Sequence, residues 1–206
     1  MISEKIKKIK KIIGPKSLIV VSKNRSFDEI LDVYNTGHRD FGENKVQELV
    51  KKHEKLPKDI KWHMIGHLQK NKVKHIIPFV HLIHSVDSIE LLEKINTISK
   101  KKEKITNCLI QIKIAQEESK FGMSKSHFDI IKVNMNQFSF VNIKGLMGMA
   151  TASLNKEKIK KEFNSLHKLY LNSSDFKILC MGMSQDYKIA NECGSNMFRI
   201  GSYIFS

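Results

Sequence analysis

Lys23 is the residue whose type and position first suggest chemistry in this chain of 206 residues. It ends the run Leu18–Lys23, in which four consecutive aliphatic residues indicate a strand buried on both faces of a parallel sheet. A lysine at the last position of such a strand would lie where the sheet opens to ligand. Partial desolvation there would favour the neutral amine, which can form a Schiff base with a carbonyl compound. Lysine is abundant in this chain, so Lys23 needs partners elsewhere in the sequence.

A second group of residues, near the end of the chain, could bind a phosphate. Ser184 precedes a predicted short helix over Gln185–Glu192, and a hydroxyl beside the free N–H groups of a helix N-terminus binds anions. Gly201 and Ser202 follow the last predicted strand and form a turn whose backbone can approach a phosphate closely. Arg199 adds a fixed positive charge between them.

The elements that must position these groups are apolar runs that alternate with segments of helical periodicity. The predicted strands are Leu18–Lys23, Arg39–Asn44, Lys61–Gly66, His81–Val86, Asn107–Ile114, Val141–Met147, Phe176–Met181 and Met197–Ile200. Eight such units predict an α/β fold, a single closed (β/α)₈ TIM barrel over residues 1–206. A doubly wound open sheet is the alternative, but the chain has no GxGxxG or GxxxxGK[ST] motif.

Composition excludes several other classes of protein. No apolar run approaches the roughly 18 residues of a membrane span, so we expect no membrane insertion. The formal net charge of +15 comes from lysine spread along the chain rather than from arginine, which disfavours specific nucleic-acid binding. Three cysteines without CxxC spacing favour a reducing, cytoplasmic location. No His, Asp or Glu grouping has metal-ligand spacing, so we expect no metal site.

The predicted barrel brings the two chemical groups to one rim. In this fold the chemistry lies at the C-terminal ends of the strands, and the loops after strands seven and eight often bind phosphate. An aldehyde-reactive Lys23 and a phosphate site around Ser184 would therefore face each other. That pairing predicts pyridoxal 5′-phosphate as the cofactor.

The chain also resembles the pyridoxal phosphate homeostasis protein family, whose barrel is similar to the N-terminal domain of alanine racemase. The resemblance runs from Ile19 to Phe205 and rests on motifs in the expected order. These are Val20–Lys23, Phe41–Asn44, Val46–Glu48, Trp62–Gly66, Leu68–Gln69, Asn71–Lys72, His84–Asp87, Glu118–Gly122, Gly145–Met147, Met181–Ser184 and Arg199–Gly201. Lys45 and Cys180 depart from the family pattern, which often has an aromatic residue and a serine there, but neither is a proposed aldimine or phosphate residue.

The resemblance implies a role for each cofactor-binding residue. Lys23 would carry the cofactor as an aldimine, and Arg199 would face the pyridine nitrogen. Asn44 would lie beside the ring, and Met147 would line the pocket. The phosphate would be held by Ser184, Gly201 and Ser202.

Two functions remain open at this stage. The first is intracellular homeostasis of pyridoxal phosphate by a monomeric, non-enzymatic carrier, with apo-enzymes that depend on the cofactor as possible recipients. The second is an amino-acid racemase. Racemases similar to this barrel have a further β-domain that supplies a tyrosine base, and this sequence stops at Ser206. Two-base proton transfer needs a second positioned base, and no convincing one is evident, so we expect no catalytic residue and favour homeostasis.

Overall fold

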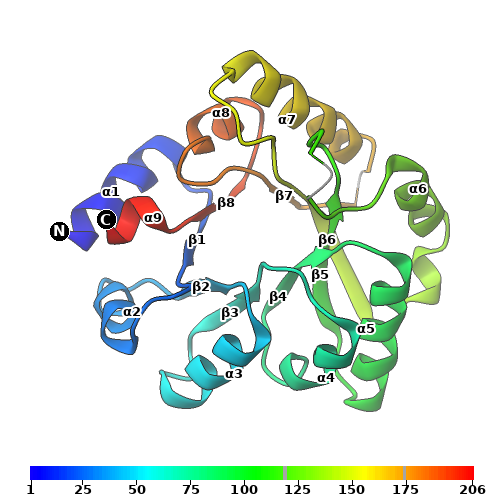
Figure 1. Ribbon diagram of the computed structural model, residues 1–206. Coiled ribbons are helices and arrows are strands. Elements are labelled where there is room, and N and C mark those ends of the chain that lie inside the picture. The colour runs from blue at the N-terminus through cyan, green and yellow to red at the C-terminus, as the bar shows by residue number, and fades with distance from the viewer. Residues whose placement is uncertain (118–119, 174) are drawn as a thin grey trace.

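The computed structural model describes residues 1–117, 120–173 and 175–206 and shows a closed barrel of parallel strands in sequence order (Figure 1). Each strand pairs with the next, and β1 closes the barrel by pairing with β8 from Ser17↔Met197 to Val20↔Ile200. The prediction of a (β/α)₈ barrel is confirmed. The strands are β1 (Ser17–Val21), β2 (Asp40–Glu43), β3 (Lys61–Met64), β4 (Leu82–Val86), β5 (Thr106–Ile112), β6 (Val141–Gly148), β7 (Ile178–Cys180) and β8 (Met197–Ile200).

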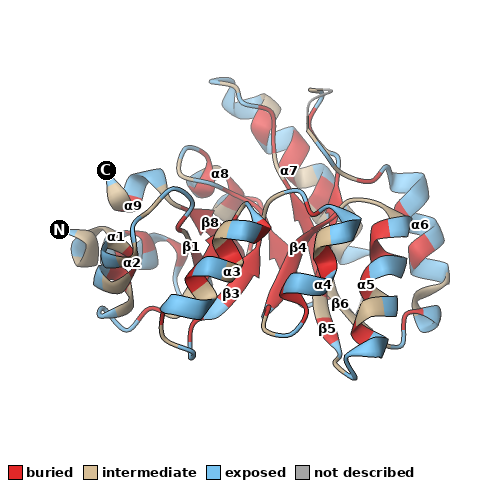
Figure 2. Cartoon of the chain, turned by 60° about the horizontal axis from the view of Figure 1, so that its bottom comes forward, coloured by how far each residue is buried: buried red, intermediate tan, exposed pale blue. Residues whose placement is uncertain are grey.

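Helices surround the barrel and bury their apolar faces against the outer surface of the strands (Figure 2). The longest, α7, begins after the capping residue Asn155, whose side chain accepts a hydrogen bond from the Lys158 backbone. The helices are α1 (Ile2–Ile13), α2 (Phe27–Tyr34), α3 (Val46–Lys55), α4 (Val73–Ile76), α5 (Ile89–Lys101), α6 (Lys125–Val133), α7 (Lys156–Leu171), α8 (Tyr187–Glu192) and α9 (Ser202–Phe205), with 3₁₀ turns η1 (Lys70–Lys72) and η2 (Met135–Gln137).

Successive side chains of each strand point alternately outward and inward, and this divides the core into two parts. Side chains that point outward join the helices in one large apolar cluster. Side chains that point inward fill the barrel with a smaller cluster of Ile19, Leu82, Leu109, Met147, Cys180 and Met197. The barrel interior is therefore packed at its centre and is open to a ligand at a rim.

Most predicted strands and the predicted helix over Gln185–Glu192 differ from the observed elements by one or two residues at an end, and two of these differences have a clear local cause. β1 ends at Val21 rather than Lys23, because the Arg25 N–H bonds back to the Ser22 carbonyl at 3.1 Å and Asn24 adopts a φ of +59°. The predicted helix over Gln185–Glu192 begins at Tyr187. There the Asp186 carboxylate accepts a hydrogen bond of 2.6 Å from the Met183 N–H, which holds residues 183–186 as a turn.

Within the described ranges, no helix is both long enough and apolar enough to cross a membrane.

Gly145 permits a close approach between two strands that lead to the C-terminal rim. It has a φ of +156°, and a Cβ atom there would lie 1.8 Å from the Ile178 carbonyl oxygen of β7. No side chain fits in that space. The pairing of β6 with β7 thus depends on a glycine at this position.

We expect Gly145→Ala to lower the free energy of unfolding by about 3 kcal/mol or more, because the added methyl must displace the β7 backbone. Gly37→Ala is the matched control, since Gly37 also has a positive φ, +87°, but faces open space. Backbone strain alone should cost the control about 1–2 kcal/mol. Urea unfolding measures both, and equal losses would contradict the steric explanation.

Candidate functional site

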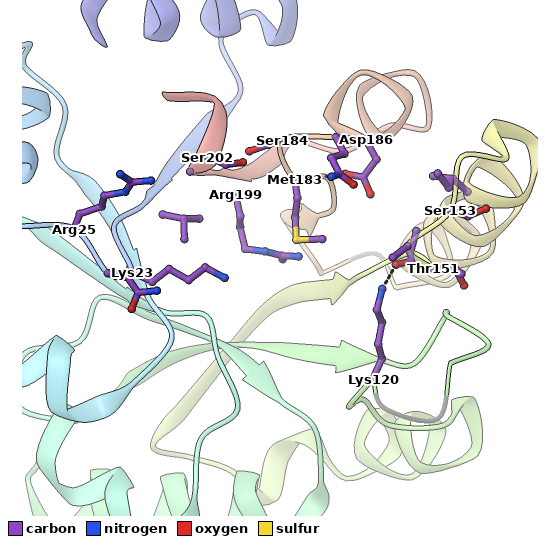
Figure 3. A pocket seen from close by; sticks show the side chains of 17 residues that line it. Lys23, Arg25, Lys120, Thr151, Ser153, Met183, Ser184, Asp186, Arg199 and Ser202 are labelled. Carbon is purple, nitrogen blue, oxygen red and sulfur yellow. Dashed lines mark hydrogen bonds between the residues drawn. The ribbon is translucent and has the colours of Figure 1, made fainter. Parts of the chain in front are cut away.

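A cavity of about 600 Å³ opens at the C-terminal ends of the strands (Figure 3). Its walls come from the turn after β1, the loop 150–153 after β6, residues 183–186 after β7 and the turn after β8. Lys120 completes the opposite wall. Five of the predicted cofactor-binding residues line this single cavity: Lys23, Ser184, Arg199, Gly201 and Ser202.

The turn that carries Lys23 is held from behind by a buried ion pair. Lys52 of α3 donates from Nζ to the Ser22 carbonyl at 2.9 Å and to Glu43 Oε1 at 2.7 Å. The Ser22 hydroxyl donates to the same carboxylate oxygen at 2.6 Å. Lys23 itself is exposed at the rim, in contrast to the partial burial predicted for it, because the turn lifts it beyond the end of β1. Its side chain points into the cavity, toward Arg199 (Figure 3).

Arg199 is the charged group at the base of the cavity. It lies on β8, is 4% exposed, and donates to Cys180 Sγ at 3.1 Å and to the Gly148 carbonyl at 3.4 Å. Burial raises the pKa of the Cys180 thiol, although the nearby guanidinium acts against this, so the thiol remains protonated. Both partners of the guanidinium are therefore neutral, and its positive charge is available to a ligand.

Cys180 links Arg199 to two histidines inside the barrel. Its sulfur lies 3.5 Å from His84 Nδ1, and His84 Nε2 lies 2.9 Å from His63 Nδ1. Burial, with neighbouring His63 and the charge of Arg199, holds the pKa of His84 well below its usual value, so this imidazole is neutral. A column of polar side chains thus runs from the base of the cavity through the barrel interior.

Small polar groups from the turns after β7 and β8 form one side of the cavity rim. The Ser184 hydroxyl accepts a long hydrogen bond, 3.4 Å, from the Tyr203 N–H, which brings the turns after β7 and β8 together. Gly201 lies so close to Val21 that a Cβ atom would be 2.8 Å from the Val21 carbonyl oxygen. Ser184 and Ser202 lie side by side in Figure 3. Their hydroxyls and the backbone at 201–202 gather polar groups that could bind an anion on one side of the cavity.

The charges that line the cavity are mainly positive. Lys23, Arg25, Lys120 and Arg199 contribute cations, and Asp186 contributes a carboxylate. Burial raises the pKa of Asp186, against the opposing effects of the Met183 N–H and the Arg199 charge. This balance suits a ligand that carries more than one negative charge.

Two predicted site residues lie elsewhere among the described residues. Asn44 follows β2 and packs closely against Gly66, where a Cβ atom would meet the Asn44 carbonyl at 2.3 Å. Met147 is fully buried in the interior cluster of the barrel. Neither contributes to the lining of the cavity as the structure describes it, and their roles beside the cofactor remain predictions.

The groups that hold the loop after β6 were not predicted from the sequence. Thr151 donates from its backbone N–H and its hydroxyl to the two carboxylate oxygens of Glu162, each at 2.7 Å. A glutamate next to Phe163 on the buried face of α7 was the available signal. Lys120, whose role the sequence left open, donates to the Ala150 carbonyl of the same loop. Of the motif Glu118–Gly122, residues 118 and 119 lie outside the described residues.

Comparison with known proteins gives a consistent family. The whole chain, residues 1–206, matches the family described as alanine racemase, N-terminal domain. The pyridoxal phosphate homeostasis protein of Helicobacter pylori strain J99 is 38% identical, with 91% of this chain and 86% of the relative covered. The human protein of that name is 35% identical, with 91% and 75% covered.

Solved structures support the fold. PipY of Synechococcus elongatus PCC7942, a structure with pyridoxal phosphate bound, has a TM-score of 0.91 and 29% identity, with all of both chains covered. Alanine racemase of Bartonella henselae has a TM-score of 0.80 at 16% identity and shows a similarity of fold, over 99% of this chain and 58% of the racemase.

Proposed function

Because this chain belongs to the pyridoxal phosphate homeostasis protein family, we propose that it binds pyridoxal 5′-phosphate in the cavity at the C-terminal rim and serves the intracellular homeostasis of that cofactor. The observation that carries the proposal is the convergence of an exposed Lys23, a buried Arg199 and the hydroxyl of Ser184 on one cavity. The elements that bring them together are at opposite ends of the chain. PipY, which is similar over its whole length, has a structure with this cofactor bound.

The cavity fits the cofactor in size and in charge. A volume of about 600 Å³ lies within the range of small-molecule sites. Ser184, Ser202 and the backbone at Gly201 would hold the phosphate, whose negative charge offsets the cations of the lining. Lys23 would bind the aldehyde as a Schiff base, and the turn fixed by Lys52 and Glu43 presents its amine to the cavity.

Arg199 would decide what the bound cofactor can do. Pyridoxal phosphate supplies an electron sink for carbanions when its ring nitrogen is protonated. A guanidinium stays charged and offers donors alone, so at the ring nitrogen it would donate a hydrogen bond and leave that nitrogen unprotonated. The contacts of Arg199 with Cys180 and Gly148 hold the guanidinium in a fixed orientation. This arrangement favours a carrier over a catalyst.

An amino-acid racemase is the second candidate function, since alanine racemases share the fold. Racemisation needs two bases on opposite sides of the substrate carbon. Lys23 could serve as one. Asp186 is held in a hydrogen bond with the Met183 backbone, and Lys120 in one with the Ala150 backbone and an ion pair with Glu117, so both have structural partners. We therefore propose a non-enzymatic role, with apo-enzymes as recipients of the cofactor.

Replacement of Lys23 by alanine tests the anchor. We expect the wild-type protein to show a visible absorption band of the bound cofactor and to retain it covalently at Lys23 after borohydride reduction. Lys23→Ala should lose both, because no amine remains at this point of the rim. Lys45→Ala, which removes an exposed lysine at the start of α3, should keep both. An unchanged band in Lys23→Ala would show that another lysine holds the cofactor.

Ser184→Ala tests the phosphate pocket. A hydrogen bond to a charged group contributes about 1.5–3 kcal/mol, so the dissociation constant of the cofactor should rise by roughly tenfold to a hundredfold while the absorption band survives. Ser153→Ala is the control, because Ser153 lines the same cavity from the loop after β6. Equilibrium dialysis measures the affinities. Equal affinities in the two variants would exclude Ser184 from the phosphate pocket.

Exchange of the α-proton of free amino acids separates the carrier from the racemase. With Arg199 at the ring nitrogen, exchange should stay far below about 1 s⁻¹, the lower end of ordinary enzyme turnover. Deuterium incorporation in D₂O, followed by mass spectrometry across the standard amino acids, measures this rate. Sustained turnover at about 1 s⁻¹ or faster on any of them would establish an enzyme.

A further inference from the structure

Three potential metal ligands meet at the end of the barrel opposite the cavity. Asp40 is the first residue of β2, His63 lies within β3, and His81 immediately precedes β4. The strands are parallel and adjacent, so these residues lie at neighbouring N-terminal ends. One ligand atom from each lies within 4.8 Å of the others. We propose that Asp40, His63 and His81 bind a divalent transition metal of the zinc class.

No metal site was predicted from the sequence, because these three residues lack the short spacing along the chain that is typical of metal ligands. The three residues come from three successive βα units and become neighbours only when the barrel closes. A short sequence motif therefore cannot predict this site. The register of β2 with β3, in which Asp40 pairs with Lys61 and Gly42 with His63, brings the first two ligands together.

The donor types and the spacing of the ligands fit a metal. An imidazole offers a nitrogen lone pair and a carboxylate offers oxygens, and both are donors that zinc binds. His63 Nε2 and Asp40 Oδ1 lie 3.2 Å apart, a spacing close to that of two ligands on one tetrahedral zinc, about 3.4 Å.

His81 is the ligand that must move. Its side chain is exposed at the barrel mouth, with its ring centroid 5.3 Å from that of His63, and its backbone is fixed by a hydrogen bond to the Trp62 carbonyl at 2.8 Å. A rotation of this exposed ring can shorten the longest separation without moving the strands. Water would complete the coordination.

His84 supplies the outer-shell contact that metal-bound histidines usually have. With Nε2 of His63 on the metal, its Nδ1–H would donate to His84 Nε2, now 2.9 Å away. His84 is fully buried and its other nitrogen lies 3.5 Å from Cys180 Sγ, so the ring of His63 is fixed in orientation. In this arrangement His63 and His84 each carry one proton, so neither imidazole has to be charged.

The ligand set selects the class of metal. Two imidazoles and a single carboxylate suit zinc and its neighbours, whereas magnesium and calcium need more oxygen ligands. Lys61, paired in register with Asp40, adds a positive charge at this mouth and further disfavours ions that bind by charge alone.

Cobalt titration of the full-length, tag-free protein tests the site, because Co²⁺ bound to such ligands shows visible d–d bands. Zn²⁺ removes these bands when it displaces Co²⁺. We expect one Co²⁺ per chain. His81→Gln should weaken Co²⁺ binding by at least about tenfold, and Asp40→Asn should do the same from another ligand. His75→Gln, which replaces an exposed histidine of α4, should leave the titration unchanged.

The outcome is decided by the variants together. Circular dichroism and thermal unfolding without metal establish whether each variant is folded. If His81→Gln does not fold, Asp40→Asn tests the site in its place. Absence of a one-to-one band in the wild type overturns the proposal. So does a His81→Gln or Asp40→Asn titration that coincides with that of His75→Gln, since the metal would then bind scattered surface histidines. These readouts do not depend on the cofactor, so they remain valid if the proposed function is wrong.

Discussion

Closure of the barrel between its first and last strands is the constraint on which everything else in the molecule depends. The pairing of β1 with β8 joins segments that are almost the whole chain apart, and its register aligns Ile19 with Arg199. That alignment sets Lys23, two residues beyond β1, beside the turn that follows β8. A slip of one residue would turn the inward side chains of β8, Arg199 included, toward the helices. Fold and site are therefore specified by the same hydrogen bonds.

The barrel interior combines an apolar centre with a line of polar groups. From Asp40 at one mouth, contacts pass through His63, His84 and Cys180 to Arg199 at the other. Buried polar groups cost free energy unless each finds a partner, and here each member contacts the next. Because hydrogen bonds have direction, the line links the orientation of groups at both ends of the barrel. The two mouths are consequently less independent than their separation suggests.

The sequence was sufficient for the barrel and for five of the residues around its cavity, because both depend on local pattern. Alternating strands and helices predict the fold, and strand ends in a barrel always share a rim, which places Lys23 with Arg199. The contacts that support the site could not be predicted from the sequence. Lys52 lies in a helix rich in charged residues, and nothing in its periodicity shows that it is buried against Glu43. Boundaries failed where one side chain, such as that of Asp186, redirects the backbone.

The concentration of like charge around the cavity has a consequence for the life of the protein in the cell. Four cations, Lys23, Arg25, Lys120 and Arg199, line one small cavity, and Glu29 pairs with Arg25 and Glu117 with Lys120. Any dianion that binds there stabilises the folded chain by mass action, in proportion to the logarithm of its concentration. Proteases act on the unfolded fraction, so occupancy would slow degradation. The abundance of the protein would then follow the supply of its own ligand.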